Sequence, residues 1–192
     1  MFIDRILAPI TALGPGNRLV IWTKGCSKHC HNCANPELWN IDGARNYDVA
    51  EIIQISKNII NEQKITGITI SGGDPLEQKE DILLLLKELS KNVDDILVYT
   101  GYTVEQLESL WSKEEIDILK ANISVLIDGP YIDEKNEELA VLKGSTNQNI
   151  IFFKPKYEKI YLEYFKDGRT IQNVYMGEKL ISVGIHNRKG DF

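Results

Sequence analysis

Outside residues 25–33, this 192-residue chain contains no cysteine. A framework of several disulfides, of the kind that stabilises small secreted domains, is therefore excluded. The three cysteines that the chain does have, Cys26, Cys30 and Cys33, all lie in the stretch GCSKHCHNC. Three thiols in one loop of a chain that otherwise avoids them indicate a dedicated chemical role for that loop.

Long apolar runs are also absent. The longest apolar stretch near the middle, residues 82–86, is far too short to span a bilayer, so we expect no membrane partner. The first ten residues, MFIDRILAPI, include Asp4 and Arg5 and lack the apolar run of a secretory signal peptide. These two absences predict a cytoplasmic protein.

The chain also lacks an excess of positive charge. It has 22 Lys and Arg against 28 Asp and Glu, and a net charge of −6 argues against a nucleic-acid partner held by phosphate contacts. The distribution is uneven, because residues 151–192 contain eight Lys and Arg but only five Asp and Glu. This local excess fits either a solvated surface or a docking patch for an acidic partner.

Apolar runs alternate with amphipathic segments of helical length. The runs are nearly continuous in apolar residues, as in strands buried on both faces of a parallel sheet, and they cover residues 18–23, 66–71, 95–100 and 123–128. Helical patterns follow over residues 49–60, 76–91 and 103–120, with a break near Ser112. The alternation predicts an α/β fold with a parallel sheet and right-handed crossovers. Arg18, at the start of the first run, is expected to be exposed.

The pattern changes after residue 150. A short strand (IIFF) and a charged amphipathic stretch, residues 157–166, precede two strand-like runs that flank Gly177. Alternating apolar residues in the second run indicate a half-buried hairpin strand. We therefore divide the chain into a core, residues 1–150, and a strand-rich C-terminal extension, residues 151–192, packed on the same domain.

Each strand of the predicted parallel sheet is followed by a polar turn that contains glycine. The first leads into the cysteine loop, and the others end in SGGDP, TGYT and DGPY. Since the carboxyl ends of parallel strands share one edge, we expect these turns to meet around a ligand site. In SGGDP, the two glycines permit close backbone approach and Asp74 offers a carboxylate for an ammonium group, although the motif also fits a simple turn that starts a helix.

Four chemistries are compatible with the cysteine loop. A disulfide is disfavoured by the odd number of thiols and their tight spacing. A structural zinc site needs four ligands, and His29 or His31 would have to supply the fourth. A loop without metal is the third possibility. The fourth is an iron–sulfur cluster, in which three thiolates leave one iron open to a small molecule. His29 and His31 themselves are expected to be loop residues.

The spacing C-x3-C-x2-C after a strand, together with SGGDP, resembles the radical S-adenosylmethionine (SAM) superfamily. The ordered set GPGNR (14–18), the cysteine motif, SGGDPL, YTGYT (99–103), LIDGPY (126–131) and LKGSTNQ (142–148) resembles the activating proteins of anaerobic (class III) ribonucleotide reductase. The resemblance covers roughly residues 9–150.

The resemblance implies an enzyme with one 4Fe–4S cluster, held by Cys26, Cys30 and Cys33, and with SAM on the open iron. It also implies the residues that contact SAM: Gly72, Gly73, Asp74, Thr100, Gly101, Asp128 and, before the third cysteine, Asn32. No side chain is needed as a catalytic base, because the abstracting species is a radical derived from SAM. Each of the residues outside the cysteine and glycine motifs also has a local structural interpretation, such as a loop cap for Asp128.

The implied partners are a protein substrate, namely a glycyl-radical enzyme such as anaerobic ribonucleotide reductase, and a small reductant protein such as flavodoxin or ferredoxin. At 192 residues the chain is too short for a full barrel of ~250 residues, so we expect an incomplete (β/α) barrel of radical SAM type with a wide mouth. Asn32 stands where many members have an aromatic residue, and residues 151–192 extend past the compact activators. These departures leave open another glycyl-radical enzyme or a peptide as the substrate, or a non-enzymatic zinc or iron–sulfur module.

Overall fold

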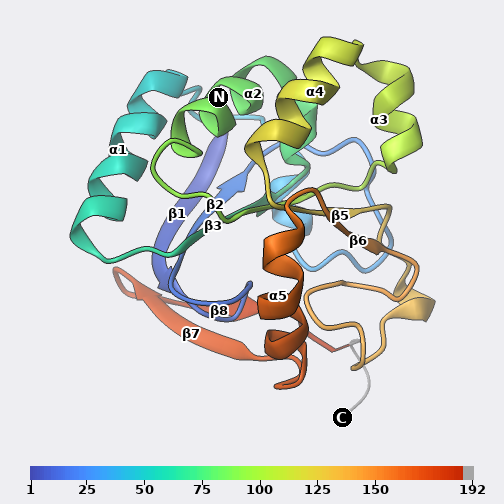
Figure 1. Ribbon diagram of the computed structural model, residues 1–192. Helices are drawn as coiled ribbons and strands as arrows, with labels where there is room; N and C mark the ends of the chain where they lie inside the picture. The colour runs from blue at the N-terminus through green and yellow to red at the C-terminus, as the bar shows by residue number, and fades with distance from the viewer. Residues whose placement is uncertain (188–192) are drawn as a thin grey trace.

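A computed structural model of the protein describes residues 1–187 (Figure 1). Its main feature is a six-stranded sheet in which the strands follow one another in chain order. The strands are β1 (Ile3–Ile10), β2 (Arg18–Thr23), β3 (Gly67–Gly72), β4 (Ile96–Tyr99), β5 (Val125–Asp128) and β6 (Asn149–Phe152). β2 to β5 are parallel, whereas β1 and β6 run antiparallel to their neighbours at the two edges.

The predicted α/β fold with a mostly parallel sheet is therefore confirmed. Two findings differ from the sequence-based expectation. β1 is an additional edge strand that the alternating pattern does not predict, and it pairs with β2 through two register shifts. β6 crosses the predicted boundary at residue 150 and completes the sheet, so the division into core and extension stays a prediction.

The helices between the parallel strands lie along one side of the sheet (Figure 1). They are α1 (Val49–Glu62), α2 (Lys79–Leu89), α3 (Val104–Leu110) and α4 (Lys113–Asn122). The break near Ser112 is confirmed, because Thr103 and Ser112 each begin a helix with a complete capping box. Their apolar faces cover strand residues that are entirely buried, such as Ile70 and Val98.

Short 3-10 turns mark the loops that leave the carboxyl ends of the strands. They are η1 (Pro36–Leu38), η2 (Pro75–Glu77), η3 (Asp133–Lys135) and η4 (Pro155–Tyr157). The first three follow the cysteine loop, the SGGDP turn and the DGPY turn, respectively. Each loop is therefore locally ordered where the sequence predicts a ligand site.

The C-terminal extension lies on the opposite side of the sheet from α1–α4 (Figure 1). It contains α5 (Glu158–Phe165) and a two-stranded antiparallel hairpin, β7 (Ile171–Met176) and β8 (Lys179–Gly184). The predicted hairpin around Gly177 is thus confirmed. Val183 of β8 is buried in a cluster with Leu7 and Trp22, so the hairpin packs against the β1–β2 end of the sheet.

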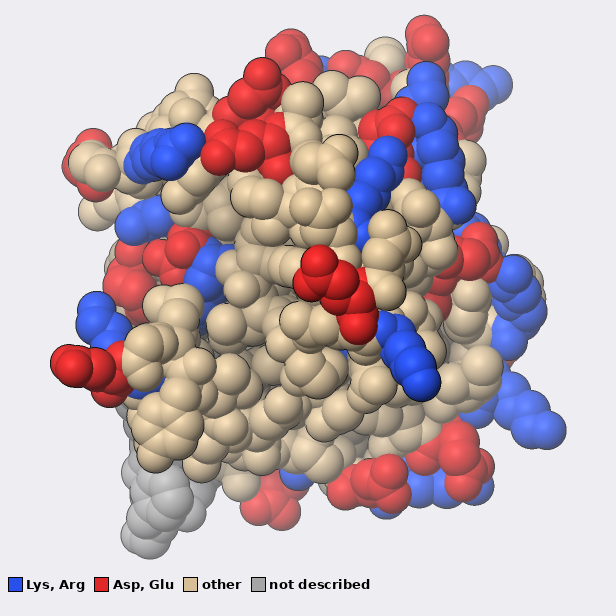
Figure 2. Space-filling view, turned by 90° about the vertical axis from the view of Figure 1, so that its left-hand side faces the viewer, with Lys and Arg blue, Asp and Glu red and all other residues tan. Residues whose placement is uncertain are grey.

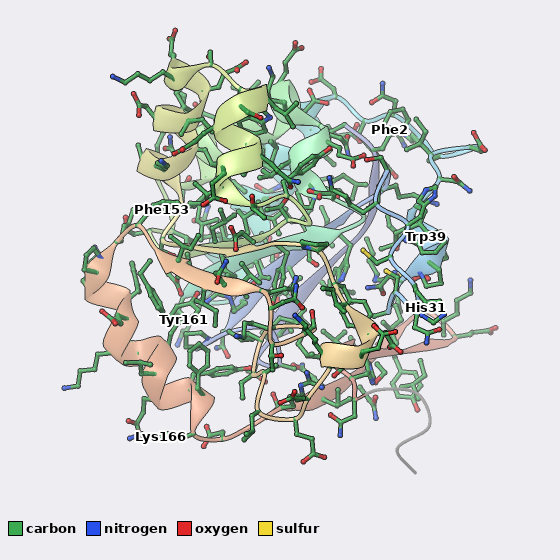
Figure 3. All side chains as sticks on the ribbon, turned by 90° about the vertical axis from the view of Figure 1, so that its right-hand side faces the viewer. Phe2, His31, Trp39, Phe153, Tyr161 and Lys166 are labelled. Carbon is green, nitrogen blue, oxygen red and sulfur yellow. The ribbon has the colours of Figure 1, made fainter. Side chains whose placement is uncertain are left out.

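Arg18 is buried, and the expectation that it is exposed is wrong. Its guanidinium forms an ion pair with Asp95, with 2.7 Å between Nη1 and Oδ2, and also donates to Thr69 and to the carbonyl of Ile68. Tyr161 of α5 donates to the same carboxylate at 3.0 Å. Figure 3 shows Tyr161 in the interior, beside α5. A charged side chain is stable there because its donors are satisfied.

Part of the basic charge of the extension is paired with acidic residues among the described residues. Lys154 and Lys156 both pair with Asp94, and Lys166 pairs with Glu163. Figure 2 shows one face of the molecule with a broad uncharged area in its centre and with residues of both charges intermixed along its lower edge. These pairs favour a solvated surface over a docking patch for an acidic partner.

Within residues 1–187, no helix is both long enough and apolar enough to cross a bilayer.

Candidate functional site

The strand register brings the cysteine loop against the SGGDP turn. β2 and β3 are in parallel register from Arg18 opposite Gly67 to Thr23 opposite Gly72, so both strands end at the same level. Beyond that level, Gly73 N–H donates to the carbonyl of Thr23 at 2.9 Å and Asp74 N–H donates to the carbonyl of Gly25 at 2.8 Å. The two motifs are therefore joined by backbone hydrogen bonds before any side chain is considered.

The two glycines of SGGDP are required by this close approach. A Cβ at Gly73 would lie 2.2 Å from the carbonyl oxygen of Gly25, and a Cβ at Gly72 would lie 2.3 Å from backbone atoms of Thr23. Gly72 also has φ +121°, a conformation that residues with a side chain rarely adopt. The sequence predicts glycines that approach a ligand closely, and in the structure the closest approach is to the backbone of β2 and the cysteine loop.

The cysteine loop is shaped by its own backbone. Gly25 and Cys26 donate to the carbonyls of Leu38 and Trp39, which ties the start of the loop to η1. Asn32 has φ +54°, in the left-handed region that asparagine tolerates better than an aromatic residue does. The conformation gives a local reason for asparagine at the position before the third cysteine.

A second anchor of this loop comes from η2. Ser27 donates to the Glu77 carboxylate through its N–H at 2.9 Å and its hydroxyl at 2.6 Å. Tyr102 donates to the same carboxylate at 3.4 Å. Glu77 is a positioning residue that no motif predicts, although its place two residues after SGGDP is a signal that could have indicated it.

Asp74 is a buried carboxylate of the site, at the end of the SGGDP turn that faces the cysteine loop. Its side chain accepts hydrogen bonds from the Thr100 hydroxyl at 2.9 Å, from Gly101 N–H at 2.8 Å and from Leu76 N–H at 3.1 Å. Only 1% of the residue is exposed. Burial raises its pKa to about 6, against the lowering effect of these donors. A cation placed beside it would be bound strongly, because it would relieve this desolvation.

One cavity of about 470 Å³ joins the predicted residues. It is lined by nine of the ten residues that the sequence assigns to the cluster and to SAM: Cys26, Cys30, Asn32, Cys33, Gly72, Gly73, Asp74, Thr100 and Gly101. Gly144 and Gln148 of the LKGSTNQ motif line it as well. Segments that are far apart in the chain therefore meet at the carboxyl ends of β2 to β5.

Asp128 is the predicted site residue that is not part of this lining. One of its carboxylate oxygens accepts from Val104 N–H at 3.0 Å, and the other accepts from the Asn149 side chain at 2.8 Å. Asp128 thus joins the first turn of α3 to the start of β6. These contacts fit its interpretation as a loop cap, and contact with SAM stays a prediction.

The three cysteines have free, partly exposed thiols. Burial raises the pKa of Cys26 to about 11 and also raises the pKa of Cys30. The protein itself therefore does little to stabilise the thiolates, and positively charged iron would supply that stabilisation.

The histidines of the loop lie away from the thiol-lined wall. The His29 ring stacks on Trp39 with 4.8 Å between ring centroids, and neither His29 nor His31 lines the cavity. Figure 3 shows His31 and Trp39 at the outer edge of the molecule, on the segment that carries the cysteine loop. Both positions fit the prediction that His29 and His31 are loop residues.

The donor set fits an iron–sulfur cluster. Within residues 1–187, no three His, Cys, Asp or Glu side chains form a site for a single metal ion. The fit depends instead on three thiols in one cavity, because a cubane takes each thiolate on a different iron, whereas a closed zinc site needs four ligands on one ion.

Several lining residues are not predicted from the sequence. Residues 182–187, at the end of β8 and after it, form part of the cavity wall, as do Arg5, Lys28, Tyr131, Asp133 and Asn136. Lys28 lies over the Tyr102 ring, 3.3 Å from its centroid. Lys28 lies within the cysteine motif and Tyr131 ends the DGPY turn, whereas no local motif marks the other positions, which reach the cavity through long-range packing.

Comparison with known proteins agrees with this geometry. A family model described as a 4Fe-4S single cluster domain matches residues 12–151. The anaerobic ribonucleoside-triphosphate reductase-activating protein of Escherichia coli K12 is 32% identical over 139 residues, which cover 70% of this chain and 88% of that protein. The protein of the same name from Haemophilus influenzae is 33% identical over 146 residues, or 73% and 91% of the two chains.

A relative of a different name is also similar. The pyruvate formate-lyase-activating enzyme of Staphylococcus epidermidis is 30% identical over 149 residues, which cover 76% of this chain and 59% of that enzyme.

Proposed function

The chain belongs to the radical SAM activases, in the family of anaerobic ribonucleoside-triphosphate reductase-activating proteins, and from this we propose that it forms a radical on a glycine of a partner protein. The observation that carries the proposal is the single cavity in which three cysteines meet Gly72, Gly73 and Asp74. An anaerobic ribonucleotide reductase is the proposed partner.

Cys26, Cys30 and Cys33 are proposed to hold three irons of a 4Fe–4S cluster, so that the fourth iron is free for SAM. A 4Fe–4S cluster held by these cysteines would supply the electron for reductive cleavage of a carbon–sulfur bond of SAM, the chemistry through which a hydrogen atom would be removed from the glycine. The remaining roles belong to side chains and backbone groups that bind and orient the reactants.

Asp74 is proposed to accept the ammonium group of SAM. Thr100 and Gly101 hold its carboxylate through the hydrogen bonds at 2.9 and 2.8 Å, so the acceptor is oriented before SAM arrives. Gly72 and Gly73 keep this carboxylate close to the cysteine loop. Asn32, from the cavity lining, and Asp128, from outside it, are also proposed to contact SAM.

We further infer that the sheet is an incomplete (β/α) barrel of radical SAM type. In support, β2 to β5 follow one another in parallel order and their connecting helices lie on one side (Figure 1). The expected wide mouth would be narrowed by the extension, whose end lines the cavity. A cytoplasmic location is proposed because the thiols must stay reduced, and a flavodoxin or ferredoxin is the proposed reductant.

Anaerobic reconstitution with iron and sulfide, followed by dithionite and SAM, tests the proposal. We expect a reducible 4Fe–4S cluster, release of 5′-deoxyadenosine and, with the reductase subunit present, a glycyl-radical signal in electron paramagnetic resonance. A reducible cluster without any 5′-deoxyadenosine, even with candidate partners, would refute the enzymatic proposal and favour a non-enzymatic iron–sulfur module.

Cys30→Ala is the first variant to compare. It should not retain the cluster or cleave SAM, whereas the stability of the cluster-free chain should change by less than about 0.5 kcal/mol, because this thiol is partly exposed. Iron and sulfide content and thermal unfolding measure the two effects. His31→Ala is the control, since His31 is exposed and outside the cavity lining. Unfolding of Cys30→Ala would instead indicate a structural metal.

A second candidate substrate is another glycyl-radical enzyme. It is favoured by the similarity to a pyruvate formate-lyase-activating enzyme and by the extension beyond residue 151, where the family match ends. Incubation with both a reductase subunit and a pyruvate formate-lyase distinguishes the two, because the radical signal should develop on only one.

A further inference from the structure

The last described residues of the C-terminal extension line the cavity that contains the cysteines. Residues 182–187 all line it, from Ser182 in β8 to Asn187. They lie beyond the region that the family model matches. The 139 residues aligned with the Escherichia coli relative cover 88% of that protein but only 70% of this chain.

This wall lies across the cavity from the proposed SAM contacts. Val183 is 2% exposed and packs with Leu7 and Trp22, which places the end of β8 at the β1–β2 side of the sheet. Asp74 and Thr100 follow β3 and β4 on the other side. A SAM molecule whose ammonium group lies at Asp74 would leave the β1–β2 end of the cavity for the second reactant.

One arginine connects this wall to the 130–148 loop. Nη1 of Arg169 donates to Oδ1 of Asn136 at 2.6 Å and to the carbonyl of His186 at 3.1 Å. It also donates to Oδ1 of Asn187 at 3.1 Å, while Nη2 donates to the carbonyl of Lys143 at 3.3 Å. A single guanidinium therefore binds the last two residues of the wall segment and, at the same time, the 130–148 loop.

The contacts continue from this arginine to the cysteine loop. Asn136 donates from Nδ2 to the Tyr131 hydroxyl at 3.1 Å, and Tyr131 donates to Oδ1 of Asp133 at 2.7 Å. Oδ2 of Asp133 accepts from Nδ2 of Asn32 at 3.1 Å. Asn32 stands between Cys30 and Cys33, so a chain of hydrogen bonds joins the extension to the proposed cluster ligands.

We propose that residues 182–187 form the wall of the cavity that faces the protein substrate, and that Arg169 is the positioning residue that holds this wall in place. The proposal rests on the proposed function, because it takes a glycine-bearing protein segment as the second reactant. The proposal gives the extension a role in binding the protein substrate, whereas the cysteine motif and SGGDP are assigned to the cluster and to SAM.

The geometry explains why arginine serves here. The guanidinium presents five donors in a fixed plane, so it binds carbonyls on two segments at once, whereas the ammonium of a lysine is a single point with three donors. Without Arg169, the carbonyls of His186 and Lys143 lose a charged donor. The described contacts between the wall and the loop are then reduced to the hydrogen bonds from Asn136 to the His186 carbonyl at 3.3 Å and from Asn187 to Glu138 at 3.1 Å, so the wall is held less firmly. The Arg169→Lys variant should therefore hold the wall against the loop little better than Arg169→Ala does.

The test compares Arg169→Ala and Arg169→Lys with the wild type and with a matched control, Lys166→Ala. Lys166 lies in the same extension, is exposed and pairs only with Glu163 in the described structure. Hydrogen–deuterium exchange on the cluster-free chain measures opening of residues 182–187 and 136–144. Both segments should exchange about tenfold faster or more in Arg169→Ala, since each hydrogen bond to a charged group is worth roughly that factor.

The second measurement uses the reconstituted protein with SAM and an anaerobic reductase subunit. Arg169→Ala should bind SAM within about twofold of the wild type, but the KM for the subunit should rise and radical formed per SAM cleaved should fall by about tenfold. Lys166→Ala should match the wild type in both measurements.

Three results would overturn the inference: unchanged exchange in Arg169→Ala, an unchanged radical yield, or a parallel loss of SAM binding, which would assign the wall to the cofactor. Failure of the wild type to cleave SAM would instead refute the proposed function, and exchange would still decide whether Arg169 holds the wall. If the wild type cleaves SAM but activates neither the reductase subunit nor a pyruvate formate-lyase, the assignment of a substrate-facing wall fails.

Discussion

Asp74 shows how one side chain can be prepared for a ligand that carries positive charge. It has 1% exposure and three hydrogen-bond donors, yet burial still raises its pKa to about 6. The donors hold the carboxylate in place, but all three are uncharged groups. The ammonium group of a ligand would therefore stabilise the ionised form of Asp74, whose carboxylate is shielded from water by burial.

The pH dependence of SAM binding should therefore report on Asp74. A carboxyl with a raised pKa is protonated below about pH 6 and must lose its proton before it pairs with an ammonium group. Affinity for SAM should be constant above pH 7 and should fall by up to about tenfold per pH unit below 6. Equilibrium dialysis with the oxidised, reconstituted protein measures it.

Asp74→Asn provides the control for this titration. It keeps the shape of the side chain without the charge, so SAM should bind more weakly at pH 7 and its affinity should not change with acidification. A wild-type affinity that is the same at about pH 5.5 and pH 7.5 would show that the ammonium group binds elsewhere.

The pairing of β2 with β3 fixes the position of the SGGDP turn relative to the cysteine loop. β2 and β3 end in register, and the turn after β3 fits against the loop after β2 only because Gly73 has no side chain. A side chain at Gly101, after β4, would be accommodated more easily. A Cβ there would lie 3.0 Å from Cγ of Lys28, which belongs to a flexible side chain. The two glycines line the same cavity but differ in what surrounds them.

Gly73→Ala and Gly101→Ala should consequently behave differently. The first places a Cβ against the Gly25 carbonyl, so the cysteine loop must move and the protein should lose most of its ability to retain the cluster. The second should keep the cluster, because the Lys28 side chain can rotate away and the N–H that binds Asp74 remains. Iron content after desalting measures both, and equal retention in the two variants would disprove this explanation.

The sheet is held together at the end opposite to the cavity by a buried polar cluster. Arg18 of β2 pairs with Asp95 before β4, while Ser124 before β5 and Tyr161 of α5 donate to the same carboxylate. Gly67 of β3 leaves room for the guanidinium, since a Cβ there would lie 2.3 Å from Nη1. The cluster connects the parallel strands to the extension and leaves the opposite edge for the ligands.

Arg18→Met should be strongly destabilising for that reason. It would leave Asp95 buried without its cation, a change that costs about 3–5 kcal/mol in the free energy of unfolding. Urea denaturation of the cluster-free chain measures this cost. Arg45→Ala, which removes an exposed pair with Glu51, should cost less than about 1 kcal/mol. Similar losses in both variants would mean that the buried cluster contributes little.

The local sequence was sufficient for the features that depend on short-range patterns. The alternation of apolar runs with helical segments gave the parallel sheet, and the spacing of Cys26, Cys30 and Cys33 indicated a cluster site. Since parallel strands share one carboxyl edge, the turns after them could be placed together without coordinates. Asp74 and Gly73 were identified in this way, although the reason for the glycine, its contact with Gly25, was not.

Long-range contacts decided the rest, because they depend on packing between segments that have no pattern in common. Asn32 meets Asp133 across 101 positions, and Arg169 meets Asn136 across 33. The burial of Arg18 requires Asp95, Gly67 and Tyr161 to surround it, and none of these is near it in the chain. The cavity wall formed by residues 182–187 likewise exists only because Val183 packs against β1 and β2, which brings the end of the extension to the cysteines.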